Sequence, residues 1–130
     1  MGFMKRYEPQ TYALLRIVSG FLFIFHGIPK LQKVMAEEAS WMLYIAGPIE
    51  VIGGAMIMIG LYTSAAAFLS SGLMAGAYWL IHYSKMGGGW PINNDGDAAV
   101  LFCFLFLCIA AKGSGIWSVD GKCTKCLKET

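Results

Sequence analysis

WMLYIAGPIEVIGGAMIMIG is the sequence of residues 41–60, and Glu50 is the one charged residue within it. A helix needs about 20 mostly apolar residues to cross the ~30 Å hydrocarbon core of a bilayer. The stretch therefore predicts a membrane-spanning helix. It also places a carboxyl group near the middle of the membrane, where ionisable side chains are rare and usually functional.

Similar apolar runs lie on both sides of this stretch, at residues 12–31 and 63–83. A fourth run has an uncharged core of 14 residues, Ala98–Ala111. At 1.5 Å per residue this core covers roughly 21 Å, which is less than the hydrocarbon thickness. We therefore expect the fourth span to extend over about residues 94–112.

Composition supports a membrane protein. Hydrophobic residues make up 57% of the 130 residues and charged residues 14%, against about 25% charged residues in soluble domains. The net charge of +2 is small and no helix face carries a basic stripe, so nucleic acid is not an expected partner. We predict an all-α fold, an integral membrane four-helix bundle over residues 1–115, followed by a short cytoplasmic tail at residues 116–130.

The distribution of Lys and Arg predicts the orientation, because cytoplasmic loops carry an excess of these residues. The two termini and the turn near Tyr62 fall on one side of the predicted bundle. That side carries Lys5, Arg6, Lys112, Lys122, Lys125 and Lys128, whereas the other carries Lys30, Lys33 and Lys85. We expect a multi-pass membrane protein, surrounded by lipid, with both termini in the cytoplasm.

Five ionisable residues lie in or at the ends of the predicted spans: Arg16, His26, Glu50, His82 and Asp97. Such groups are costly in lipid and usually face the protein interior. Four of them, all except Arg16, fall in the outer half of the bundle. We predict that these four line a small polar pocket, with Arg16 as a further candidate member. No catalytic residue is assigned among them.

A buried carboxylate needs a basic partner or becomes uncharged. We expect Glu50 to contact Arg16, with His26 as the next candidate. The alternative is a purely structural network in which Arg16 or Lys30 neutralises Glu50 and the histidines bond to backbone or lipid headgroups. For each residue the two interpretations stay open.

Two short motifs allow more than one interpretation. Gly72 and Gly76 form a GxxxG pattern, which is typical either of a dimer seam or of close packing within a bundle, and we favour packing. Cys123 and Cys126 form a lone CxxC in the tail, which could be half of a zinc site, a redox pair or two surface thiols. No second cysteine pair follows them, so a metal site there is weakly supported.

Taken in order, these residues resemble the DoxX family of small bacterial and archaeal membrane proteins. The resemblance runs from Leu14 to Asp120. Its pieces are Leu14-Leu15-Arg16, His26-Gly27 with Lys30, Ile49-Glu50 before Gly53-Gly54, Gly60-Leu61, His82, Trp90-Pro91 leading to Gly96-Asp97, and residues 113–120 (GSGIWSVD). Family members usually carry Glu where this chain has Asp97, and the CxxC tail is not part of their pattern.

The resemblance implies a four-helix inner-membrane protein whose relatives are linked to thiosulfate:quinone oxidoreductase and quinol oxidase complexes, or to oxidant-defence assemblies. The leading hypothesis is a quinone-interacting subunit with a membrane or redox protein partner. His26 or His82 would bind a quinone oxygen, Glu50 or Asp97 would relay a proton, and Arg16 would set the charge state of the carboxylate.

Two alternatives are a non-catalytic accessory subunit and, less favoured, a small transporter. A haem between the two histidines, or a metal held by both with a carboxylate, is a weaker hypothesis for the cofactor. Whether the protein is itself an enzyme, and whether it forms a homo-oligomer, stays open at this point.

Overall fold

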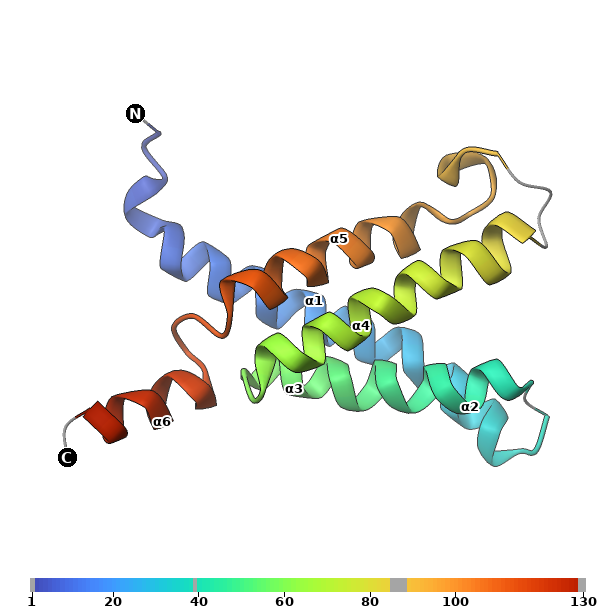
Figure 1. The fold of residues 1–130 in the computed structure, drawn as a ribbon, viewed down its shortest axis with the longest axis horizontal. Coiled ribbons are helices and arrows are strands. Elements are labelled where there is room, and N and C mark those ends of the chain that lie inside the picture. The colour runs from blue at the N-terminus through green and yellow to red at the C-terminus, as the bar shows by residue number, and fades with distance from the viewer. Residues whose placement is uncertain (1, 39, 85–88, 129–130) are drawn as a thin grey trace.

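The computed structural model describes residues 2–38, 40–84 and 89–128, and for residues 124–128 it describes the backbone alone. Within these ranges every regular element is helical (Figure 1). The elements are the 3₁₀ turn Lys5–Tyr7, α1 Glu8–Met35, α2 Trp41–Pro48, a π-helical segment Ile49–Gly53, α3 Gly54–Ile59, α4 Thr63–Ala77, a π-helical segment Tyr78–Tyr83, the 3₁₀ turn Pro91–Asn93, α5 Asp97–Lys112 and α6 Val119–Lys128.

Three continuous helical rods of the described chain are long and apolar enough to cross a membrane: Lys5–Met35, Trp41–Ile59 and Thr63–Tyr83, of 31, 19 and 21 residues. The fourth, α5, has 16 residues, which is about 24 Å of helix. It begins at Asp97 rather than at residue 94, because the preceding residues form a separate 3₁₀ turn and Asp95 adopts a positive φ of 54°. A helix cannot continue through a left-handed residue.

The rods form a bundle in two pairs. Helix α1 packs along α2 and α3, and α4 packs along α5 (Figure 1). Rings join the pairs, because Phe23 of α1 contacts Phe106 and Phe102 of α5 at centroid distances of 4.6 and 5.8 Å. The outward faces remain apolar and exposed, with Phe21 and Phe25 on α1 among them. An apolar exterior around a small core is the pattern expected for a bundle surrounded by lipid.

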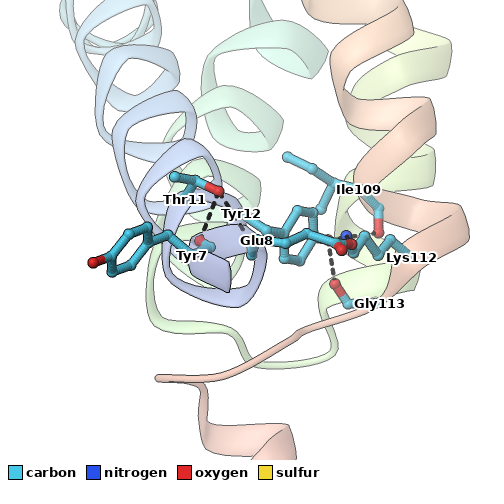
Figure 2. Close-up of polar contacts among 7 residues, drawn as sticks. All are labelled: Tyr7, Glu8, Thr11, Tyr12, Ile109, Lys112 and Gly113. Carbon is cyan, nitrogen blue, oxygen red and sulfur yellow. Dashed lines mark hydrogen bonds and ion pairs between the residues drawn. The ribbon is translucent and has the colours of Figure 1, made fainter. Parts of the chain in front are cut away.

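The two ends of the bundle differ in what they hold. The terminal end holds both termini and the turn between α3 and α4, and the loop end holds the connections from α1 to α2 and from α4 to α5 (Figure 1). At the terminal end the Tyr12 hydroxyl donates to the Gly113 carbonyl at 2.5 Å, and Lys112 pairs with Glu8 at 2.8 Å (Figure 2). The described terminal segments and the Tyr62 turn thus lie at the same end of the bundle, as predicted, whereas the side of the membrane that this end faces stays a prediction.

Glycines set the distance between α1 and α3. A Cβ added at Gly20 would lie 2.6 Å from the Gly54 carbonyl oxygen, and one added at Gly54 would lie 2.8 Å from the Gly20 carbonyl oxygen. In contrast, a Cβ at Gly72 or Gly76 would meet nothing within 4 Å. The GxxxG pattern therefore does not mediate packing inside the bundle, and our preference for that interpretation was wrong. The two glycines instead line an open apolar groove between α2 and α4.

This contrast gives the first prediction. Gly20→Ala forces two backbones apart and is expected to destabilise the protein by about 1–3 kcal/mol, as overpacking does in other cores. Gly72→Ala adds the same methyl group to open space and is expected to be neutral or stabilising by up to about 1 kcal/mol. Thermal unfolding of both variants in detergent measures the difference. Equal melting temperatures for the two variants would contradict this packing argument.

Candidate functional site

A lysine–glutamate pair lies inside the bundle. Glu50 is fully buried in the π-helical segment Ile49–Gly53, and its Oε1 accepts from the Lys30 Nζ of α1 at 2.5 Å. Gly27 makes room for it, because a Cβ there would lie 2.8 Å from the Glu50 Cβ. The expectation that Glu50 is buried beside a basic group is confirmed. Our expectation that Arg16 is the partner is wrong. Arg16 precedes Lys30 by 14 residues on α1, which is about 21 Å along the helix.

The pair is asymmetric in its access to the surface. The Glu50 side chain has no exposed area, whereas the Lys30 side chain is 33% exposed. The second carboxylate oxygen, Oε2, is buried and has no hydrogen-bond partner among the described residues. Buried carboxylate oxygens are normally satisfied, and an exception calls for an explanation such as a role in chemistry. Glu50 thus has one oxygen bound to a fixed charge and one oxygen open to a proton or a donor.

The local backbone at Glu50 is irregular for a reason visible in the sequence. Pro48 lies inside the helix, and proline has no N–H to donate to the carbonyl four residues earlier. The helix continues past it as the π-helical segment that carries Glu50. Single π turns are rare and occur frequently at functional sites. His82 lies in the second π-helical segment, Tyr78–Tyr83, so both irregular segments carry an ionisable side chain.

The other predicted pocket residues make separate contacts. His26 is exposed, shares a hydrogen bond with its own helix at the Leu22 carbonyl (2.9 Å) and packs edge-on against the Phe102 ring at 5.6 Å. The half-buried His82 bonds through Nδ1 to the Asn94 carbonyl at 3.0 Å.

Asp97 is exposed at the start of α5, where it lines an open groove beside Trp90 and Ile92. Within the described residues no hydrogen bond or ion pair joins Glu50 to His26, His82 or Asp97. A pocket shared by all four side chains stays a prediction.

Arg16 is fully buried at the terminal end and bonds to backbone carbonyls. Its Nη1 donates to the carbonyls of Ile57 (2.6 Å) and Met58 (2.8 Å), which are in the last turn of α3. Its Nη2 donates to the Trp117 carbonyl at 2.8 Å. The last carbonyls of a helix have no partner within the helix, and Arg16 supplies donors for two of them. Arg16 therefore ties α1, α3 and the segment after α5 together.

Asp120 also lies at the terminal end, where it bonds to the start of α4. Its carboxylate accepts from the backbone N–H groups of Tyr62 and Thr63, both at 3.0 Å, and from the Thr63 hydroxyl at 3.1 Å. Burial alone would raise the pKa of Asp120, but these hydrogen bonds outweigh it and hold the pKa below its ordinary value. In the sequence, Asp120 is notable only as the last residue of the GSGIWSVD stretch at residues 113–120. Its role as the cap of α4 depends on a contact between residues 57 positions apart.

The first residues of the tail contact the bundle. The Asp120 N–H donates to the Gly60 carbonyl at 2.9 Å, so the start of the tail packs onto the turn after α3. Cys123 is exposed, and the side chain of Cys126 lies outside the described residues. Among the side chains that the structure describes, no group of three or more His, Cys, Asp or Glu residues is placed to hold a metal ion.

Comparison with known proteins decides the family. The DoxX family model matches residues 11–83, a range that contains Arg16, Lys30 and Glu50. The chain belongs to the DoxX family. This DoxX protein is 35% identical over 130 residues to a Haemophilus influenzae protein named "Uncharacterized protein", with 94% of this chain and 97% of that protein covered.

It is also 32% identical over 124 residues to the Bacillus subtilis protein named "Putative oxidoreductase CatD", with 89% of this chain and 88% of that protein covered. No solved structure matches it. Together with the three long apolar helices, these matches identify a DoxX-family membrane protein.

Removing the Arg16 guanidinium is expected to destabilise the protein strongly. Arg16→Met removes the guanidinium donors from the carbonyls of Met58 and Trp117 and leaves the Ile57 carbonyl with the Gly60 N–H at 3.3 Å. Each unsatisfied buried group costs about 1–3 kcal/mol, so a total of about 3 kcal/mol is expected. Arg6→Met removes an exposed arginine at the same end and is the matched control. Thermal unfolding in detergent measures both variants. If Arg16→Met has the same melting temperature as Arg6→Met and the wild type, Arg16 does not hold this end of the bundle together.

The Asp120 cap should depend on pH in a defined direction. A carboxyl group whose pKa is lowered by folding stabilises the protein above its unfolded pKa, near 3.9, and this contribution is lost as the pH falls through the folded pKa. Asp120→Asn is expected to cost about 1 kcal/mol at neutral pH. The difference in the free energy of unfolding between Asp120→Asn and the wild type should disappear below about pH 4. Asp95→Asn, which changes an exposed carboxylate, is the control. A stability difference between Asp120→Asn and the wild type that does not depend on pH would refute the role of the carboxylate.

Proposed function

We propose that this DoxX protein is an integral membrane subunit of a quinone-linked redox complex or of an oxidant-defence complex in the inner membrane, and that Glu50 carries protons for it. The proposal rests on one observation, a fully buried carboxylate that has one oxygen on Lys30 and one without a partner in the described part of the chain. The name of the Bacillus subtilis relative as an oxidoreductase supports the redox part. Both termini would face the cytoplasm, following the positive-inside rule.

Glu50 and Lys30 suit proton transfer better than a static role. A Lys–Glu pair is neutral overall, so its burial costs less than that of an isolated charge. Protonation of the carboxylate leaves a positive lysine that is one-third exposed and can be screened at the surface. Oxidation of a quinol releases two protons and two electrons, and a positioned carboxylate can accept one proton at a time. His26, which is exposed and lies one helical turn before Lys30 on α1, would pass that proton onward.

Electrons would have to come from or go to a partner protein. This chain has no nucleotide-binding motif, and the proposal gives its own side chains only the binding and proton steps. The complex would therefore contain a second protein that holds the electron carrier. The predicted polar pocket at His26, Glu50, His82 and Asp97 is part of the proposal only as the region through which the proton leaves.

A non-catalytic accessory subunit is the second candidate function. It is favoured by the terminal end, where Arg16 and Asp120 are used in backbone contacts. If the Lys30–Glu50 pair is also only structural, the whole polar interior serves assembly. In that case the loss of the pair should reduce the amount of complex and its activity in parallel.

Substitutions at the pair separate these functions. Glu50→Gln keeps the size of the side chain and removes the proton-carrying group. We expect the protein and its partner to stay assembled, whereas quinone-dependent electron transfer in isolated membranes should fall about a hundred-fold or more. Lys30→Met leaves a buried charge unpaired and should destabilise the protein, and the double variant Lys30→Met/Glu50→Gln should regain stability but not activity.

The exposed Lys33→Met, three residues further along α1, is the matched control and should have no effect. The measurements are the amount of co-purified partner, the thermal stability and the electron-transfer rate. Full activity of Glu50→Gln would rule out the proton-carrying role. A loss of activity that only follows the loss of assembled complex would favour the accessory function.

A further inference from the structure

A second site lies between α4 and α5 at the loop end. It is a groove of about 680 Å³ whose walls come from α4, the π-helical segment Tyr78–Tyr83, the chain at Gly89–Pro91 and α5. This volume falls in the range of small-molecule sites, which are about 300–1,000 Å³ and mostly apolar with few polar groups. The residues of the Lys30–Glu50 pair do not line it, so it is distinct from the site described above.

One wall of the groove is aromatic. Tyr78 and Trp79 lie edge to face at 5.4 Å, and Trp79 and Tyr83 lie 5.0 Å apart. Trp90, in the connection to α5, lines the same groove and is 76% exposed. The first three belong to the π-helical segment, whose wider turn changes the directions of its side chains relative to a regular α-helix. Such a set of rings suits a flat ring that can stack or meet them edge-on.

Polarity changes along the groove. Toward the loop end, the Tyr78 hydroxyl donates to the Gly89 carbonyl at 3.4 Å, a long bond that a better acceptor could replace. Asn94 does not line the groove but lies next to Tyr78; it is 1% exposed, and its Nδ2 has no acceptor among the described residues. A Cβ at Gly96 would lie within 3 Å of both the Asn94 Oδ1 and the Tyr78 ring, so the two side chains adjoin.

Further into the bundle, the groove is lined by apolar side chains and one thiol: Met74, Ala75, Val100, Cys103 and Phe104. Phe104 is 66% exposed on the outer face of α5, so this part opens to the surrounding lipid. A molecule that fits the whole groove has a flat ring with a polar edge at one end and an apolar tail at the other. A phospholipid supplies the tail but no flat ring for the aromatic wall.

We propose that the groove between α4 and α5 binds the ring of a lipid-soluble quinone, with the polar edge of the ring at the Tyr78 hydroxyl and the tail leaving between Ala75 and Phe104 into the membrane. This inference rests on the proposed function, which requires a quinone near this chain. Because Lys30 and Glu50 do not line the groove, a proton released from a quinol bound there would reach Glu50 through an intermediate carrier rather than by direct transfer. Tyr78 would then be the residue that orients the quinone.

Photolabelling of the full chain in lipid nanodiscs tests the site. The probe is an azido-substituted short-chain ubiquinone, and an excess of unsubstituted short-chain ubiquinone is the competitor. Competed label is expected within the segments Tyr78–Tyr83 and Val100–Phe104. Ala75→Phe fills the groove and should weaken binding about ten-fold. Ala65→Phe adds the same bulk to an exposed position of α4 in other grooves and is the matched control.

The outcomes are distinct. Competed label near Lys30 and Glu50 instead would overturn the groove assignment and leave the proposed function standing. A phospholipid that co-purifies with the wild type and is lost in Ala75→Phe, without competed quinone label, would show an acyl-chain site and overturn the assignment as well. An absence of competed label anywhere would count against the groove and against the quinone part of the proposed function together.

Discussion

The architecture depends on one interaction, the bonding of the buried Arg16 guanidinium to backbone carbonyls. In a membrane every polar backbone group must be satisfied within the protein, and Arg16 donates to carbonyls at the end of α3 and at Trp117. Arg16 joins three segments at that point. It holds α1 against α3 at the Gly20–Gly54 contact, and this contact in turn fixes the position of Glu50 against Gly27 and Lys30.

The two buried ionised groups on these helices therefore differ in what they can do. An arginine is always protonated in proteins, and both terminal nitrogens of Arg16 donate to backbone carbonyls, so Arg16 cannot take part in a protonation cycle. Glu50 has one oxygen without a partner among the described residues and a partner, Lys30, that reaches the surface. Of these two buried ionisable residues, Arg16 is used in backbone contacts at the terminal end of the bundle, whereas Glu50 is the one to which our proposal gives a proton-carrying role.

Some of this could be predicted from the sequence and some could not. Long apolar runs and the cost of charge in lipid are enough to place helices and to bury Glu50. The partner of Glu50 depends on how α1 is rotated and shifted along α2, which the Gly27 contact decides. The partners of Arg16 are backbone carbonyls, which leave no pattern in the side chains. Asp120 caps a helix that begins far away in the sequence, and the open position of Gly72 and Gly76 follows from helix pairing.

The unequal lengths of the helices have a consequence for the membrane itself. Helix α1 has 28 residues, or about 42 Å, whereas α5 has 16, or about 24 Å. A bilayer adapts to a short apolar span by thinning and to a long one by tilting that span. If α5 crosses the membrane, as the sequence predicts, the protein has a thick side and a thin side, and lipid headgroups with their water come closer to the midplane beside α5.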